Sequence, residues 1–348
     1  MNIPPIISAK SLGAMPQFAL EHLGTRALDR ALERVGLPHR FIQARDGYIP
    51  KHMLAEFIDE LSKATGEQSI GLCWAPYLTV EDYGAWGAYV LSAPDLGEAL
   101  KRAQRVMPFH SSSDHTSFDF DGDLASYSYH FMLTQHCAYP NIAYSALGVV
   151  LSIFRHYLGS DWCPTRIHCD FARPSNADDA EAAFGCQISW NTQRLAILFP
   201  REFLSSRRLI EGSGFVTVED VARERMSGPP NNFSDIVAAL LRLQLETDKI
   251  SVDNAARALD MGIRTFQRRL RDDNLSFREL SNHVVMGRAL ELLRLGTLSV
   301  GMIATELGYN DPNNFSRAFR DWYGVKPTEH TAIKQVHQCG KQSWHLCN

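Results

Sequence analysis

SVGMIATELGYNDPNNFSRAFRDWYGVKP, residues 299–327, is the stretch that decides the fold of the C-terminal part of the chain. Apolar residues recur at helical spacing in its first half, and a glycine then breaks the run. Asp311 is a suitable N-cap for a second helix, and Pro312 suits the first helical position, where the backbone N–H has no partner to lose. The apolar and helix-ending positions are Ile303, Ala304, Leu307, Gly308, Gly324 and Pro327. The stretch predicts two helices joined by a tight turn, a helix-turn-helix motif.

The second helix of this motif has one apolar and one polar face. Phe315 and Phe319 are four residues apart, so they share a face and are expected to point into the core. The polar face carries Asn313, Ser316, Arg317 and Arg320. For Asn313 a role at the helix start is as good an interpretation as contact with a DNA base.

SVDNAARALDMGIRTFQRRL, residues 251–270, forms a second helix-turn-helix pattern, interrupted at Gly262. Phe266 and Leu270 are predicted to face the core. The opposite face then carries Arg264, Gln267, Arg268 and Arg271. Arginine can pair bidentately with guanine and glutamine with adenine in the major groove, with about 1–3 kcal/mol of base discrimination for each good pair. The alternative is a solvated basic helix, but such a face is usually mixed with acids, and none occurs between Ile263 and Arg271.

These two motifs resemble the AraC/XylS family of bacterial transcription regulators, whose DNA-binding domain carries two helix-turn-helix motifs over about a hundred residues. The second motif matches the family pattern at Ile303, Ala304, Leu307, Gly308, Tyr309, Asp311, Phe315, Arg317, Phe319, Arg320, Tyr323, Gly324 and Pro327. The first matches it at Ala256, Leu259, Met261, Arg264, Thr265, Gln267, Arg268, Arg269 and Leu270. Gly262 and Phe266 depart from the usual Ser and Leu, and neither change conflicts with the fold.

The segment between the motifs predicts one connecting helix that ends at Gly296. Its apolar positions are Leu280, Val284, Ala289, Leu292 and Leu293. A stiff connector fixes the distance between the two motifs. The resemblance implies that the two recognition helices enter successive major-groove segments on one face of double-stranded DNA, which bends to admit both.

The composition of the chain is that of a globular protein with room for two domains: 348 residues, 45% hydrophobic and 21% charged. No run approaches 18 consecutive apolar residues, and the N-terminus lacks the pattern of a signal peptide, so we expect a soluble, cytoplasmic protein with no membrane contact. The seven cysteines include no CxxC pair, which favours reduced thiols. Cys163, His168 and Cys169 surround a predicted strand whose alternation separates them, so neither a metal nor a cofactor is expected.

The net charge of −4 is divided unevenly along the chain. Residues 230–348 hold 15 Lys and Arg against 13 Asp and Glu, or +2, and residues 1–229 hold 20 against 26, or −6. Binding to DNA therefore depends on where the arginines lie rather than on bulk charge, with a salt-dependent contribution from phosphate contacts.

The N-terminal part is predicted to be an α+β domain, followed by the all-α DNA-binding domain. Helices are expected at residues 18–35, 52–64, 96–105 and 139–158, strands at 165–171, 187–190 and 195–199, and a hairpin within residues 117–131 that turns at Asp121-Gly122. The expected division is a first domain at 1–211, a linker at 212–232 containing a short helix at 218–226, a DNA-binding domain at 233–334 that opens with a helix at 231–249, and a tail at 335–348.

The N-terminal part resembles the arabinose-binding-like domain in the branch of the same family that includes ornithine-utilisation regulators. The resemblance depends on TGEQSIGLCWAP near residue 70, APDLGEAL near residue 95 and residues 163–204. It implies a domain that senses a small-molecule effector or forms a homodimer, without showing that the ligand is arabinose. Aromatic residues concentrated in the middle of this part are candidates for lining an effector pocket, although most could simply form the core. They are Trp86, Tyr89, Phe109, His110, Phe131 and Tyr144.

No pattern for an enzyme is present, since GxGxxG, GxxxxGK[ST], HExxH and GxSxG are all absent. The cluster FHSSSDH, residues 109–115, is interpreted as a polar loop, because a catalytic triad is assembled from separated segments. The sequence therefore predicts a DNA-binding transcription regulator, with activation in response to an effector and contact with RNA polymerase as the finer expectation. The alternative is a regulator whose N-terminal domain only dimerises and whose DNA binding is independent of ligand.

Overall fold

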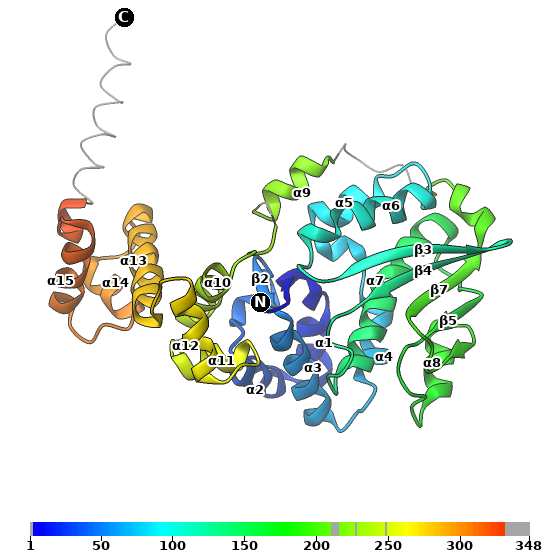
Figure 1. Cartoon of the computed structure of the whole chain (residues 1–348), viewed down its shortest axis with the longest axis horizontal. Coiled ribbons are helices and arrows are strands. Elements are labelled where there is room, and N and C mark those ends of the chain that lie inside the picture. The colour runs from blue at the N-terminus through cyan, green and yellow to red at the C-terminus, as the bar shows by residue number, and fades with distance from the viewer. Residues whose placement is uncertain (1–2, 210–215, 227, 248, 331–348) are drawn as a thin grey trace, which may run out of the picture. The chain divides into compact units, whose positions relative to one another are not determined.

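The structure of the protein is a computed structural model that describes residues 3–209, 216–226, 228–247 and 249–330 (Figure 1). It divides into two compact units, residues 1–239 with 257–260 and residues 240–256 with 261–348. The division falls inside helix α10 (Phe233–Glu246), which was expected to open the DNA-binding domain. Residues 212–215 of the expected linker and the tail at 335–348 lie outside the described residues.

The C-terminal unit is helical throughout the residues that are described (Figure 1). After α10 come α11 (Val252–Ala258), α12 (Ile263–Asp272), α13 (Phe277–Leu295), α14 (Val300–Glu306) and α15 (Pro312–Tyr323). The caps explain these bounds. Ser276 and Glu279 form a capping box at the start of α13, Gly296 ends that helix in the left-handed region, and Asp311 caps α15 through the N–H of Asn313.

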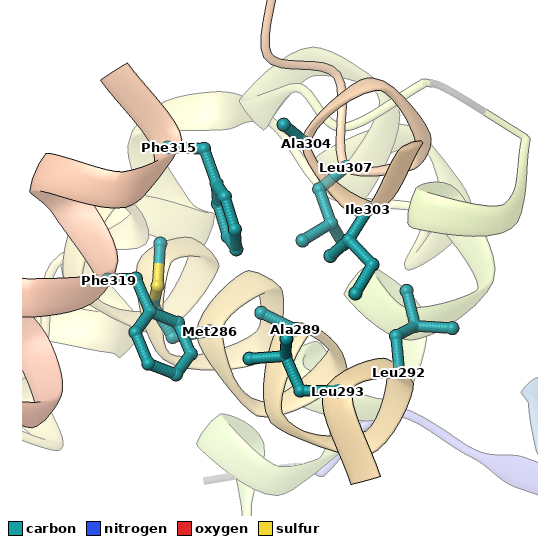
Figure 2. Close-up of a cluster of buried hydrophobic side chains, with 9 residues drawn as sticks. All are labelled: Met286, Ala289, Leu292, Leu293, Ile303, Ala304, Leu307, Phe315 and Phe319. Atoms are coloured by element: carbon teal, nitrogen blue, oxygen red, sulfur yellow. The ribbon is translucent and has the colours of Figure 1, made fainter. Parts of the chain in front are cut away.

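The hydrophobic core of the second motif joins three helices (Figure 2). Phe315 and Phe319 point from α15 toward α13 and α14, and both are fully buried. The other core members are Met286, Ala289, Leu292 and Leu293 from α13 and Ile303, Ala304 and Leu307 from or next to α14. The predicted apolar faces of these helices therefore meet in one cluster.

The N-terminal unit contains a five-stranded sheet in the order β3-β4-β7-β5-β6. The strands are β3 (His115–Asp121), β4 (Leu124–His130), β5 (Arg166–His168), β6 (Ile188–Ser189) and β7 (Leu195–Pro200). Neighbouring strands pair antiparallel except β5 with β6, which are parallel. A second, two-stranded sheet pairs β1 (Ile6–Ser8) with β2 (Tyr48–Pro50).

Helices surround this sheet, and the long α7 (Tyr139–Leu158) is buried along most of its length. Phe154 of α7 packs against Phe199 of β7 with ring centroids 4.8 Å apart. Gly148 lets α7 approach the chain at Ala75, because a Cβ atom there would lie 2.3 Å from the Ala75 carbonyl oxygen. The other α-helices are α1 (Met15–Leu23), α2 (Thr25–Val35), α3 (Lys51–Thr65), α4 (Ile70–Trp74), α5 (Ala85–Leu91), α6 (Leu96–Val106), α8 (Ala177–Phe184) and α9 (Val218–Glu224).

The α+β and all-α fold classes are confirmed, and two local predictions need correction. The helix expected at 18–35 is two helices, because Gly24 has φ +82° and breaks the run. The hairpin turns at Gly122-Asp123 rather than Asp121-Gly122, since Asp121 still pairs with Leu124. In the first helix-turn-helix motif Gly262 is the N-cap of α12, and Asp260 in the turn before it has φ +51°. Among the described residues, no helix is long and apolar enough to cross a membrane.

Candidate DNA-reading helices and effector cavity

Helix α12 presents an arginine-rich face to solvent. Phe266 and Leu270 are 0% and 1% exposed, so the register of the helix is fixed by its buried side. The predicted base-reading residues Arg264, Gln267, Arg268 and Arg271 are all exposed. None of these three arginines has a carboxylate within 4.0 Å in the part of the chain that is described. Their guanidinium groups are therefore available to pair with base edges or phosphates.

Helix α15 repeats this arrangement in the second motif. Asn313, Arg317 and Arg320 are exposed, and Ser316 is half-buried. The backbone N–H of Asn313 donates to the Asp311 carboxylate at 2.9 Å, which serves the helix start and leaves the Asn313 side chain on the surface. Arg317 Nη2 donates to Asn314 Oδ1 at 3.4 Å, a long contact that a base or phosphate could replace.

Helix α13 connects the two motifs as a single rigid element. Its 19 residues span about 28 Å at 1.5 Å per residue. The Tyr323 hydroxyl at the end of α15 donates to the Met286 carbonyl of α13 at 3.1 Å, which ties the second motif to the connector.

The N-terminal unit encloses a cavity between the β3–β4 hairpin and the helices α3 and α7. The space in which the centre of a water molecule could lie is about 50 Å³. Its walls are mostly apolar, with Leu54 and Ile58 from α3 and Ile142, Val149 and Ile153 from α7 among them. Polar atoms reach it from seven side chains, which are Ser11, Tyr83, His110, Thr116, Tyr127, Tyr129 and Ser145.

The six aromatic residues proposed for an effector pocket divide into two groups. Trp86, His110 and Phe131 line the cavity. Tyr89, Phe109 and Tyr144 do not: the Tyr89 hydroxyl accepts from Arg105, the Phe109 carbonyl accepts from Tyr48, and the buried Tyr144 ring lies against Phe171 and Phe184. Alternation along β4 is the signal that could have added Tyr127 and Tyr129, which lie on the same face as Phe131.

His110 is the notable polar group of the cavity. Its ring stacks on Tyr83 at 4.9 Å with an interplanar angle of 16°, and Trp86 lies 5.8 Å away. Its Nδ1 is buried without a hydrogen-bond partner among the described residues. Burial lowers the pKa of His110 well below 6.5, and the nearby positive charges of Arg225 and Lys51 lower it further. His110 is therefore neutral in the folded protein at pH 7.

The depressed pKa of His110 predicts acid sensitivity of the N-terminal unit. Below pH 6.5 the unfolded chain binds a proton that folded His110 does not, so the free energy of unfolding falls as the pH drops, by up to about 1.4 kcal/mol per pH unit. Burial also lowers the pKa of His130, His156 and His168, so the wild-type slope has several contributions. Urea unfolding of wild type and of His110→Gln between pH 7 and about pH 5.5 isolates the contribution of His110. If the free energy of unfolding fell equally steeply with pH in both proteins, the assignment to His110 would be contradicted.

A buried ion pair lies behind the cavity wall. The Lys51 ammonium contacts the Asp114 carboxylate, and their side chains are 2% and 0% exposed. Asp114 also accepts from the hydroxyl of the cavity-lining Tyr129 at 3.2 Å. These contacts explain FHSSSDH: Asp114 pairs with Lys51, whereas His115 stacks on His130. Asp114 and His115 of that cluster thus have separate structural partners, whereas His110 Nδ1 and Ser113 Oγ are buried without a hydrogen-bond partner among the described residues.

Arg225, just after α9, is buried against the cavity-lining elements. It is 4% exposed, its guanidinium donates to Ser8 Oγ and to the Tyr83 carbonyl, the latter at 2.9 Å, and its own carbonyl accepts from the Tyr48 hydroxyl. The preceding Glu224 accepts from the backbone N–H of Ala85 at 2.7 Å. The contacts of Arg225 were missed by sequence reasoning, because nothing in the local pattern around Arg225 indicates partners more than 140 residues away.

Comparison with known proteins assigns both units. The sequence profile described as "Arabinose-binding domain of AraC transcription regulator, N-term" matches residues 26–207, or 182 of the 348 residues, and a "Helix-turn-helix domain" profile matches residues 255–332. The second range contains both α12 and α15.

Several relatives are named as transcription regulators. The chain is 24% identical to the ornithine utilization regulator of Pseudomonas aeruginosa over 76% of this chain and 79% of that protein. It is 39% identical over 98 residues to the HTH-type transcriptional regulator Mb1430 of Mycobacterium bovis, covering 27% of this chain and 28% of that protein. The match to this mycobacterial relative thus spans less than a third of either protein.

A solved structure was also found among the similar proteins. The transcriptional regulator CdpR from Pseudomonas aeruginosa is 23% identical, with a TM-score of 0.40, over 88% of this chain and 97% of that one. The family assignment comes from the two profiles, which account for both the sheet-containing unit and the paired helix-turn-helix motifs. The chain belongs to the AraC family of transcription regulators, with an N-terminal domain of the arabinose-binding type and a C-terminal helix-turn-helix domain.

Proposed function

We propose that this regulator binds promoter or operator DNA sequence-specifically as a homodimer in the cytoplasm, and activates transcription with RNA polymerase when its N-terminal domain binds a small-molecule effector. The observation that carries this proposal is the pair of helices α12 and α15, each with a buried phenylalanine side and an exposed side rich in arginine. The base-reading residues proposed are Arg264, Gln267, Arg268, Arg271, Asn313, Ser316, Arg317 and Arg320. The proposed domains are 1–211, a linker at 212–232, and 233–334.

Two features support reading by both motifs at once. Helix α13 is one continuous connector between the two motifs, and the Tyr323 hydroxyl ties α15 to it, so the positions of the two motifs are fixed relative to each other. The net charge of residues 230–348 is only +2, so affinity must come from the placed arginines, and both helices supply them.

The contacts of Arg225 support a response to an effector. Tyr83 lines the cavity, and its carbonyl holds the Arg225 guanidinium. Arg225 lies eight residues before the start of α10, in the segment that leads toward the DNA-binding residues. A ligand that displaces Tyr83 would therefore loosen or tighten this segment. An effector can change DNA binding only through such a difference between the ligand-free and the ligand-bound states.

Arg268→Ala is expected to weaken binding to a selected high-affinity DNA by about 1–3 kcal/mol and to relax the base preference at one position. Arg317→Ala is expected to do the same at the other half of the site. DNA footprinting and titration of each variant measure both effects. Arg26→Ala is the matched control, because it removes an exposed arginine from α2 in the other unit.

The two variants also separate the possible roles of these arginines. Equal losses on selected and random DNA would make Arg268 a phosphate contact with a smaller salt dependence instead of a base contact. If Arg268→Ala and Arg317→Ala lost protection of the same bases, the arrangement of two motifs on successive groove segments would be wrong. Binding that stays the same with every added metabolite would favour an N-terminal domain that only dimerises.

A further inference from the structure

We propose that the cavity between the β3–β4 hairpin and α7 takes a compact, uncharged and mainly apolar molecule with one hydrogen-bonding group, which His110 binds. This inference rests on the proposed response to an effector and adds the chemical class of the ligand. It follows from the size of the cavity, the nature of its walls and the single unsatisfied atom in them.

The size of the cavity limits the ligand to a small molecule. A space of about 50 Å³ for water centres holds about four water molecules at 10–15 Å³ each. This space is about a third of the roughly 150 Å³ of an apolar cavity that binds benzene. A short branched chain of a few heavy atoms therefore fits as the walls stand, and a compact ring enters when wall side chains move apart.

The walls favour an apolar body. Aliphatic side chains from α3 and α7 face the indole of Trp86 and the ring of Phe131 across the cavity. Several polar groups in the wall already have hydrogen-bond partners within the protein. Ser145 Oγ accepts from Trp74 Nε1 at 2.8 Å, and the Tyr127 hydroxyl donates to Thr116 Oγ1 at 3.0 Å. Burying an apolar ligand here costs no hydrogen bond and gains about 25 cal/mol per Å² of apolar surface.

The surroundings disfavour a charged ligand. Among the described residues that line the cavity, only His110 and three tyrosines can ionise. Burial lowers the pKa of His110 and raises the pKa of Tyr83, Tyr127 and Tyr129, so all four are neutral at pH 7. The full charges nearby have partners: Lys51 and Asp114 neutralise each other behind the wall, and the Arg225 guanidinium lies 3.9 Å from a Glu224 carboxylate oxygen. A carboxylate or an ammonium would enter without a counter-charge and lose its hydration.

His110 supplies the polar anchor. Of the cavity-lining residues in the described part of the chain, His110 has the one buried side-chain nitrogen or oxygen without a hydrogen-bond partner, its Nδ1. The ring is held in place by stacking on Tyr83. An unpaired buried polar atom costs free energy. A ligand hydroxyl, carbonyl or amide that reaches Nδ1 forms a hydrogen bond there and removes that cost. The Tyr83 carbonyl also accepts from Arg225, so a ligand on His110 is connected through Tyr83 to a residue of the proposed linker segment.

The test uses four probes of one shape: benzyl alcohol, toluene, benzoate and benzylammonium. Their binding to the full-length protein is followed by calorimetry and by the fluorescence of the buried Trp86. We expect benzyl alcohol to bind about 2–10-fold more tightly than toluene, and both ions to bind at least about 10-fold more weakly than benzyl alcohol. His110→Phe should remove the difference between benzyl alcohol and toluene. His115→Phe, which changes an exposed histidine on β3, should keep it.

The outcomes separate this inference from the proposed function. Benzoate or benzylammonium binding as tightly as benzyl alcohol would overturn the uncharged class, and no binding of either neutral probe up to millimolar concentration would overturn the cavity as a site. If His110→Phe does not fold, His110→Leu takes its place, and an unchanged preference for the alcohol in the folded variant overturns the anchor. A footprint recorded on the same samples tests the effector response: probe binding with an unchanged footprint supports the ligand class and contradicts the response.

Discussion

Replacing Asp114 with alanine is expected to destabilise the N-terminal unit by about 3–5 kcal/mol, because it leaves the Lys51 ammonium buried without a partner. Burial already lowers the pKa of Lys51, and Asp114 is what opposes that shift. Without Asp114 the lysine must stay charged in an apolar site or lose its proton. Losing it at pH 7 costs about 4.6 kcal/mol for an ordinary pKa of 10.4 at 1.36 kcal/mol per unit, which sets the upper limit of the effect.

The double variant Lys51→Met/Asp114→Leu is the control for this prediction. It removes both charges and puts apolar side chains in their place, so it should recover much of the loss, since a buried ion pair is often replaceable by apolar residues at little net cost. Urea unfolding followed by tryptophan fluorescence reports this unit, because four of the six tryptophans, at 74, 86, 162 and 190, lie in it. A double variant as unstable as Asp114→Ala would mean that the hydrogen bond from Tyr129 matters more than the charge pair.

Much of the fold could be predicted because its signals are local. Helix α7 begins and ends where the pattern placed it, and α13 ends at Gly296 because a left-handed residue is needed there. The prediction failed where a single dihedral decides the structure. Gly24, with φ +82°, splits one amphipathic run into two helices.

The two candidate sites differ in how well the sequence predicts them. The reading faces of α12 and α15 follow from helical period alone, since Phe266 and Phe315 fix which residues face out. The cavity combines residues from several elements, and composition cannot say which aromatic side chain meets which. Phe131 lines it, whereas Tyr144, only thirteen residues later, lies against Phe171. Contacts such as that between Lys51 and Asp114 join distant segments, and no periodic pattern in the sequence indicates them.

Phe315→Ala is expected to destabilise the second helix-turn-helix motif by about 3–5 kcal/mol. The ring is fully buried, with Tyr309 and Phe319 centroids 5.5 and 5.8 Å away, and it fills the space between α15, α13 and α14 (Figure 2). Few other side chains could close the hole, because each of these helices contributes only a few residues to the cluster. Hydrogen exchange of amides in α14 and α15 of the full chain measures the loss without requiring the two units to unfold together.

Trp322→Ala is the matched control, because it removes a larger ring from the same helix at a position that is 43% exposed, and it should change exchange little. Comparison with Arg317→Ala then distinguishes a residue of α15 that contacts DNA from a residue that holds the helix in place. Arg317→Ala should change the DNA footprint at the bases it contacts and keep the protection of the amides of α15, whereas Phe315→Ala should lose that half of the footprint and the amide protection. A Phe315→Ala variant that keeps its amide protection and its footprint would show that α15 does not depend on this core. In that case the N-cap at Asp311, and not the buried face, would hold the exposed arginines of α15 in position.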